Sequence, residues 1–257
     1  MKINKRHKFV ISSVLLSAGL FFIQASGITW RYQAIALLTV LSYFISAWTL
    51  SGGLTKVKWL TILLLPALYT AGVGLFYFLL PSSYAARIPV VVIYGIGLYA
   101  LFLTENIYSV SSVRSIQLFR SANAVGFLLT LLTGFFLFNT ILSFRFSFWI
   151  NFLLVFAVSI PLFVQGLWSV KLEDNIPKRI WVASLALSLM TAQVAMALSF
   201  WPISVSVGSL ALVTIMYTVL GLYQYQLTER LFKKTINEYA LFGAAVLLFI
   251  VLSTKWS

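Results

Sequence analysis

The sequence predicts an all-α fold: a polytopic integral membrane helical bundle with about nine transmembrane helices. Hydrophobic residues make up 61% of the chain, and its mean hydropathy is +1.00. Charged residues make up only 9%, whereas a soluble globular protein carries about 25% to cover its surface. The apolar residues also occur in long continuous runs that are bounded by charge, proline or glycine. The lipid bilayer is therefore the solvent that this chain fits.

The apolar runs have the length that a membrane crossing requires. A transmembrane helix needs roughly 20 largely apolar residues, because the hydrocarbon core is about 30 Å thick and the helix rises about 1.5 Å per residue. The nine runs that meet this condition are residues 9–26, 33–50, 59–80, 88–104, 122–142, 148–170, 180–200, 203–223 and 239–254. The connections between them are too short for a folded soluble domain. We therefore expect residues 1–257 to form a single transmembrane domain.

The basic residues predict how the spans are oriented. Lys and Arg accumulate in cytoplasmic loops, and nine spans place fourteen of the eighteen basic residues on the side of the N-terminal tail. We therefore expect a cytoplasmic N-terminus and a C-terminus on the opposite side of a bacterial cytoplasmic membrane. The first span also has the basic start of a secretory signal and a small-residue site at Ala25-Ser26-Gly27. Cleavage of that span is the alternative to the retention that we expect.

The net charge of +13 has an explanation in the membrane itself. In a soluble protein so basic a chain would suggest nucleic-acid binding. Here the bias of Lys and Arg toward the cytoplasm, facing an anionic inner leaflet, explains the charge. We expect the lipid bilayer as the partner, with other membrane or cytoplasmic proteins as further candidates and no nucleic acid.

The residues that carry most enzyme chemistry are missing from the sequence. The chain has no cysteine, and its one histidine is His7 in the basic N-terminal tail. This composition excludes thiolate metal sites and leaves an intramembrane serine protease without a general base. The HExxH, P-loop and GxGxxG motifs are also absent. We therefore predict no catalytic, cofactor-binding or metal-binding residues and no cofactor, and the sequence favours a protein that is not an enzyme.

The few acidic residues are expected on the cytoplasmic side, at or just beyond a helix end. Because we find no acid or base near the middle of a span, a proton-coupled carrier built on a buried carboxylate is poorly supported. The five acids are Glu105, Glu173, Asp174, Glu229 and Glu238. The polar positions that we consider candidates for a cytoplasmic site are Glu105, Arg114, Arg120, Asp174, Arg179 and Glu229.

Three spans end with the same pattern, G-L-[YW]-x3-L-x-[ED], at residues 97–105, 166–174 and 221–229. It suggests repeated two-helix hairpins, with chance similarity of helix ends as the alternative. Eight residues of helix rise about 12 Å, so the glycines should lie in the hydrocarbon against neighbouring helices and the acids should emerge at the cytoplasmic interface. The candidate packing glycines are Gly97, Gly166 and Gly221.

Neutral polar residues and helix-breaking residues also lie within the spans. The neutral polar residues, which either bond helices together or line a substrate path, are Gln24, Gln33, Asn139, Asn151, Gln165 and Gln193. Proline at positions 66, 89 and 161 can kink a helix. Small-residue runs such as Gly95-Ile96-Gly97 suit close helix contacts. The longest connection, residues 106–121, suits a helical extension or a short interfacial helix.

Three functions are compatible with these observations. The sequence most favours a non-catalytic subunit or scaffold of a membrane or envelope complex, because it has short loops and lacks catalytic signatures. The alternative is a permease or channel for an apolar or lipid-like substrate, which requires a cavity. A second alternative is a membrane-embedded transferase acting on a lipid-linked substrate, which requires the cytoplasmic acids and arginines to meet around one groove.

Overall fold

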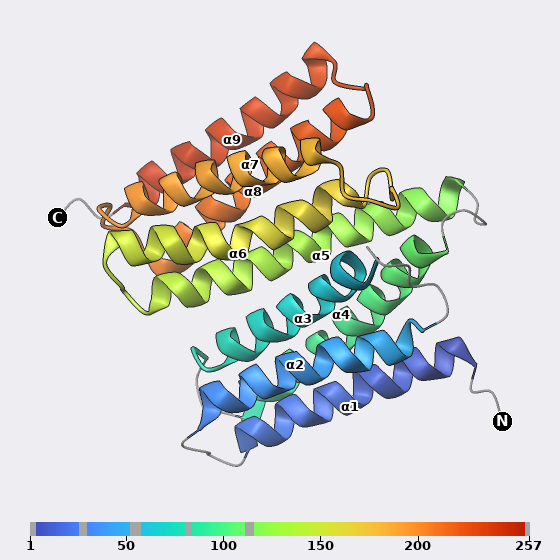
Figure 1. Ribbon diagram of the computed structural model, residues 1–257. Helices are drawn as coiled ribbons and strands as arrows, with labels where there is room; N and C mark the ends of the chain where they lie inside the picture. Colours follow the sequence, from blue (N-terminus) through green and yellow to red (C-terminus); the bar gives the residue numbers. More distant parts are fainter. Residues whose placement is uncertain (1–3, 26–29, 52–57, 81–83, 111–115, 255–257) are drawn as a thin grey trace. The chain divides into compact units, whose positions relative to one another are not determined.

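The structure confirms the all-helical membrane fold. The computed structural model describes residues 4–25, 30–51, 58–80, 84–110 and 116–254, and within them the chain forms nine α-helices and no strand. Each of these helices is long and apolar enough to cross a membrane, so the protein is a multi-pass helical bundle. The helices are α1 (Lys5–Ala25), α2 (Arg31–Thr49), α3 (Lys58–Tyr77), α4 (Tyr84–Ser109), α5 (Ile116–Ser143), α6 (Phe148–Trp168), α7 (Lys178–Leu198), α8 (Val205–Leu227) and α9 (Lys233–Ser253) (Figure 1).

The predicted spans agree with the helices one for one, and the largest differences are at helix ends. The span predicted to end at residue 104 continues as α4 to Ser109, and α5 begins at Ile116. The first and last parts of the connection predicted over residues 106–121 are therefore helical, as the end of α4 and the start of α5. Residues 111–115 lie outside the described residues. The prolines at positions 66, 89 and 161 lie inside α3, α4 and α6.

The helices group into two compact units, which divide inside α5. Unit 1 is Met1–Thr133 and contains α1 to α4 with the first part of α5. Unit 2 is Gly134–Ser257 and contains the rest of α5 with α6 to α9.

In unit 1 the four helices α1 to α4 form a closed ring. Helix α1 packs against α2 and α4, and α3 packs against α2 and α4. Two stacked tyrosines join α3 to α4, with the ring centroids of Tyr69 and Tyr94 5.7 Å apart. The Tyr94 hydroxyl donates to Thr70 Oγ1 of α3 at 2.9 Å. Because both rings are fully buried, the ring of helices is filled by aromatic side chains whose polar ends find partners within it.

In unit 2 the closest pairing is between α6 and α7, and α8 contacts α6, α7 and α9. The α7 face that is buried consists mainly of small residues, which let two helix backbones approach closely. They are Ala183, Ser184, Ser188, Thr191, Ala192 and Ala195. Polar side chains add links between helices: Asn139 Nδ2 of α5 donates to Ser209 Oγ of α8 at 2.9 Å. The last helix, α9, packs on α8 and buries Ile250 alone of its described side chains.

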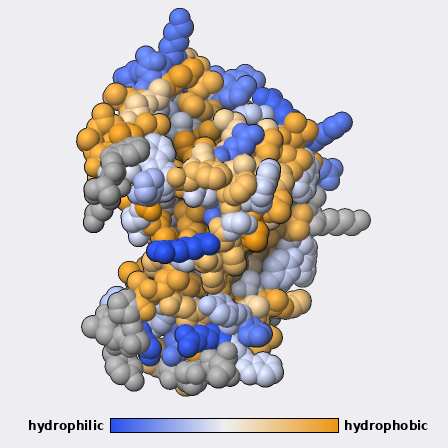
Figure 2. All heavy atoms as spheres, turned by 90° about the vertical axis from the view of Figure 1, so that its left-hand side faces the viewer, coloured by the Kyte–Doolittle hydropathy of each residue, from blue (hydrophilic) through white to orange (hydrophobic). Residues whose placement is uncertain are grey.

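Large apolar side chains are exposed along many of the described helices, including α1, α4, α6 and α9. Hydrophobic residues cover much of the face drawn in Figure 2, with hydrophilic residues gathered in smaller patches. A soluble monomer rarely exposes apolar patches of this kind, whereas a bilayer core requires them. The apolar surface therefore agrees with the membrane location that the composition predicts.

Candidate functional site

Among the candidate polar positions, Glu105 lies inside a helix rather than at its end. Helix α4 continues beyond it to Ser109, and the Glu105 side chain is fully buried. The candidate membrane span Arg87–Ser109 continues past this acid, so Glu105 lies within the span that we expected to end at residue 104, close to its end and not near its middle. The end of α4 is buried and polar, with Thr104 and Asn106 beside Glu105. A buried carboxyl group is costly in lipid, where no water can hydrogen-bond to it. It is tolerated there when polar groups of the protein surround it.

The other candidate polar positions are exposed. Asp174 follows the end of α6, Arg179 lies in the first turn of α7, and Glu229 follows the end of α8 with a φ of 58°. Arg120 lies exposed on α5, and Arg114 lies outside the described residues. The three acids of the shared pattern thus differ in burial.

Each of the three pattern glycines lies against a side chain of another helix. A Cβ atom at Gly97 of α4 would lie 2.7 Å from Cζ of Tyr69 on α3, and one at Gly221 of α8 would lie 2.6 Å from Cε1 of Tyr239 on α9. A Cβ atom at Gly166 of α6 would lie 3.1 Å from Cδ2 of Leu220 on α8. The missing side chains therefore allow these helices to approach one another closely.

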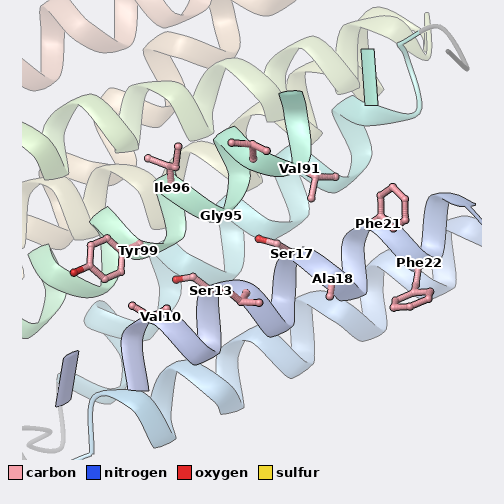
Figure 3. Close-up of a pocket in the computed structure, with 12 residues that line it drawn as sticks. Val10, Ser13, Ser17, Ala18, Phe21, Phe22, Val91, Gly95, Ile96 and Tyr99 are labelled. Atoms are coloured by element: carbon pink, nitrogen blue, oxygen red, sulfur yellow. The ribbon is translucent and has the colours of Figure 1, made fainter. Parts of the chain in front are cut away.

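Unit 1 carries an apolar groove between α1 and α4, with a volume of about 580 Å³ (Figure 3). Seven of its lining residues come from α1 and five from α4. They are Val10, Ser13, Val14, Ser17, Ala18, Phe21, Phe22, Val91, Val92, Gly95, Ile96 and Tyr99. The sequence had identified only Gly95 and Ile96 of this set, as part of a small-residue run.

Small residues form the floor of this groove and large ones its walls. Figure 3 shows Ser17 of α1 pointing toward Gly95 of α4, and a Cβ atom on that glycine would lie 2.7 Å from the serine Oγ. The two helices can pack closely here because neither residue is bulky. Among the large lining residues, Phe22 of α1 and Ile96 of α4 are 69% and 64% exposed. The groove therefore opens sideways, toward the surroundings of the helices.

The groove can hold an apolar molecule but offers little chemistry. Its twelve lining residues include no acid, histidine, lysine or arginine. The hydroxyl of Ser13 donates to the carbonyl of Phe9 at 2.9 Å, so it is already used within α1. The Ser17 Oγ is buried without a hydrogen-bond partner. The α1 lining runs from Val10 to Phe22, which is about 18 Å of helix and more than half of a hydrocarbon core about 30 Å thick.

The comparison with protein families places the chain in one of them. Residues 10–253 match the family described as Protein of unknown function (DUF5656). The chain belongs to the DUF5656 family. The match covers every lining residue of the groove in this DUF5656 chain, from Val10 to Tyr99. No curated protein and no solved structure matches it significantly.

Proposed function

We propose that the protein binds the apolar chain of a lipid-like substrate in the groove between α1 and α4 and acts as a permease for it. The observation that carries the proposal is the groove itself. Its volume of about 580 Å³ lies within the roughly 300–1,000 Å³ that is typical of small-molecule sites. The lack of acids and bases in its lining supports binding and transfer of a substrate rather than a reaction.

The chemistry of the lining favours a hydrocarbon chain. A water-soluble substrate would need polar partners for the groups that it buries, and the polar side chains of the lining are limited to the hydroxyls of Ser13, Ser17 and Tyr99, of which that of Ser13 already donates to the carbonyl of Phe9. The groove also runs along the middle of α1 and opens sideways, so a chain that is already in the bilayer can enter it without crossing water.

Photocrosslinking tests whether the groove binds such a chain. The purified protein, in bilayers that contain a phospholipid with a diazirine in its acyl chain, should be labelled mainly on α1 and α4. Ala18 is an exposed residue of the lining, so Ala18→Phe fills the groove without entering the core and should reduce this labelling about tenfold. Ala124→Phe is the matched control, because Ala124 is exposed on α5 outside the groove. Uniform labelling of all helices, or no effect of Ala18→Phe, would refute the proposed binding site.

Transfer is tested separately from binding. In reconstituted vesicles, the protein should speed the movement of a fluorescent lipid between leaflets, and Ala18→Phe should abolish most of that increase. Labelling of the groove without any transfer would support lipid binding and refute the permease function.

The second candidate function is a non-catalytic subunit or scaffold of a membrane complex, and one observation favours it. Helix α9 packs on α8 and buries a single side chain, Ile250, so nearly its whole circumference is available to lipid or to another protein. Stable co-purification with other membrane proteins, lost when exposed Leu248 is changed to Lys, would support this function. A monomer without partners in mild detergent would count against it.

The transferase remains the weakest of the three functions. It requires acids and arginines around one groove, whereas Glu105 is buried and Asp174, Arg179 and Glu229 are exposed in the other unit. No contact described above brings a carboxylate and an arginine together.

The proposed location is a bacterial cytoplasmic membrane, with the N-terminus in the cytoplasm and the C-terminus on the opposite side. The separation of fourteen basic residues from four supports this orientation. A reporter fused after Ser257 should be active only outside the cytoplasm. A fusion that is active only in the cytoplasm would reverse the orientation or change the number of spans.

A further inference from the structure

A second cavity, in unit 2, differs from the groove in its chemistry. It has a volume of about 450 Å³ and lies at the end of the unit where the α5–α6 and α7–α8 connections are. Its polar lining residues are Arg145, Asn151, Ser199 and Ser204, and its aromatic ones are Phe146 and Trp201. We refer to it as the polar pocket.

Asn151 is the buried polar residue of this pocket. Its side chain is 4% exposed, and its Nδ2 donates to the carbonyl of Phe146 at 3.2 Å and to Ser199 Oγ at 3.1 Å. These two bonds fix the orientation of the amide. Its Oδ1 is buried and has no hydrogen-bond partner. An acceptor left in this state is destabilising, so a donor such as a hydroxyl is the group that the site is missing.

Positive charge and positive helix ends gather around the same pocket. Arg145 lies exposed between α5 and α6. Helix α8 begins at the pocket with Ser204 and Val205 in the lining, and Phe146 and Asn151 lie on either side of the start of α6. Ser147 makes no side-chain capping bond to the first turn of α6, whereas at α8 the Ser204 hydroxyl accepts a hydrogen bond from the N–H of Val207. Helix N-termini favour anions, because their N–H groups and the helix dipole point outward there.

The aromatic residues around the pocket indicate its depth in the membrane. Trp149 and Phe200 are exposed at the same helix ends, and Phe148 packs against Phe200 with ring centroids 5.0 Å apart. Aromatic belts of this kind mark the membrane–water interface, where phospholipid headgroups lie.

We propose that the polar pocket binds a phosphate group that carries a nearby hydroxyl, as in a phosphoglycerol group. Arg145 and the N–H groups at the starts of α6 and α8 that have no capping partner hold the phosphate. Asn151 Oδ1 accepts a hydrogen bond from the hydroxyl. The phosphoglycerol belongs either to an anionic lipid headgroup or to a soluble glycerol phosphate, and the two sources are separable by experiment. The site does not depend on the proposed function of the groove.

The test uses the full-length protein in a neutral detergent and measures binding by titration calorimetry. The probes are short-chain phosphatidylglycerol, short-chain phosphatidylcholine, glycerol 3-phosphate and inorganic phosphate. Phosphatidylglycerol should bind at least about tenfold more tightly than phosphatidylcholine, which lacks the hydroxyls and carries a compensating cation. Binding of phosphatidylglycerol without glycerol 3-phosphate assigns the pocket to a lipid headgroup, and comparable binding of both assigns it to a soluble phosphate ester.

Arg145→Asn tests the assignment to this pocket. Arg145 has a φ of 51°, a left-handed conformation that Asn adopts more readily than most residues, so the change removes the charge and preserves the backbone. It should weaken phosphatidylglycerol binding about tenfold or more. Arg230→Asn is the control, because Arg230 is exposed in the connection after α8. Equal binding of phosphatidylglycerol and phosphatidylcholine by the unmodified protein overturns the proposal without any variant, as do equal losses in both arginine variants.

Discussion

The two units stabilise their helix contacts in different ways. Unit 1 closes α1 to α4 into a ring and fills it with aromatic residues, and it buries the carboxyl group of Glu105. Unit 2 joins α6 to α7 through small residues and leaves α9 packed mainly on α8. The same type of helix therefore has neighbours on several sides in unit 1, whereas α9 is exposed almost all round.

The difference shows that the environment of a short sequence pattern depends on the helices packed around it. The acid of the shared pattern is buried in unit 1, at Glu105, and exposed in unit 2, at Asp174 and Glu229. The glycine of the pattern meets a tyrosine in both units, at Gly97 and Gly221. Tyr69 is fully buried, whereas Tyr239 is only partly buried, so the tyrosine that meets the glycine is more completely enclosed in unit 1 than in unit 2.

The largest effect is expected for Glu105→Ala. Truncation leaves a cavity and removes an acceptor from a buried polar environment, so we expect a loss of roughly 2–4 kcal/mol in the free energy of unfolding. Insertion and topology should be unchanged, because acids contribute little to orientation. Unfolding in mixed detergent micelles measures the loss. Glu173→Ala, at an exposed position, should change stability by less than about 0.5 kcal/mol, and equal effects of the two variants would contradict the burial of Glu105.

The second effect compares the same substitution in the two units. Gly97→Ala pushes a Cβ atom against Tyr69, which is stacked on Tyr94, and should cost about 1–3 kcal/mol as overpacking. Gly221→Ala meets Tyr239 at a similar distance, but that side chain is only partly buried and has more room to shift than Tyr69, so the cost should stay below about 1 kcal/mol. The same unfolding assay ranks the two variants. A larger loss for Gly221→Ala would reverse the comparison between the units.

The smallest effect is expected at Gly243 in α9. Among the described residues, a Cβ atom there would meet Thr218 Oγ1 alone, at 3.9 Å, which is an ordinary contact. Because glycine weakens a helix interior by roughly 0.5–1 kcal/mol relative to alanine, Gly243→Ala should stabilise the protein slightly, by about 0.5 kcal/mol. Destabilisation measured by thermal unfolding would mean that α9 is covered more closely than its packing on α8 implies.

The sequence predicted the spans well because hydropathy is a local property. Each of the nine apolar runs corresponds to one helix, and the helix ends differ by a few residues. The end of α4 was missed because an acid usually marks the edge of a span. The burial of Glu105 depends on the other helices of unit 1, and none of those contacts can be read from residues near position 105.

The groove was not predicted, because it depends on which helices are neighbours. Ser13 and Ser17 are four positions apart on α1, and Gly95 belongs to a small-residue run on α4. The small residues on each of the two helices could therefore be seen in the sequence. Neither set of small residues identifies α1 and α4 as neighbours, because two helices lie between them in the sequence. The polar pocket was missed for the same reason, although Asn151 had been noted as a polar residue within a span.

The closed ring of unit 1 has a consequence for how the protein is made. Residues of α1 and α4 that meet in the groove, such as Ser17 and Gly95, are far apart in order of synthesis. At about 5–20 residues per second, the roughly 80 positions between them take about 4–16 s to translate. During that interval α1 is in the membrane with α2 and α3 but without α4, and its small-residue face is open to lipid or to the insertion machinery. The groove therefore forms late in the assembly of unit 1. A lipid or protein that covers the small-residue face of α1 must leave this face or remain in the groove when α4 is inserted.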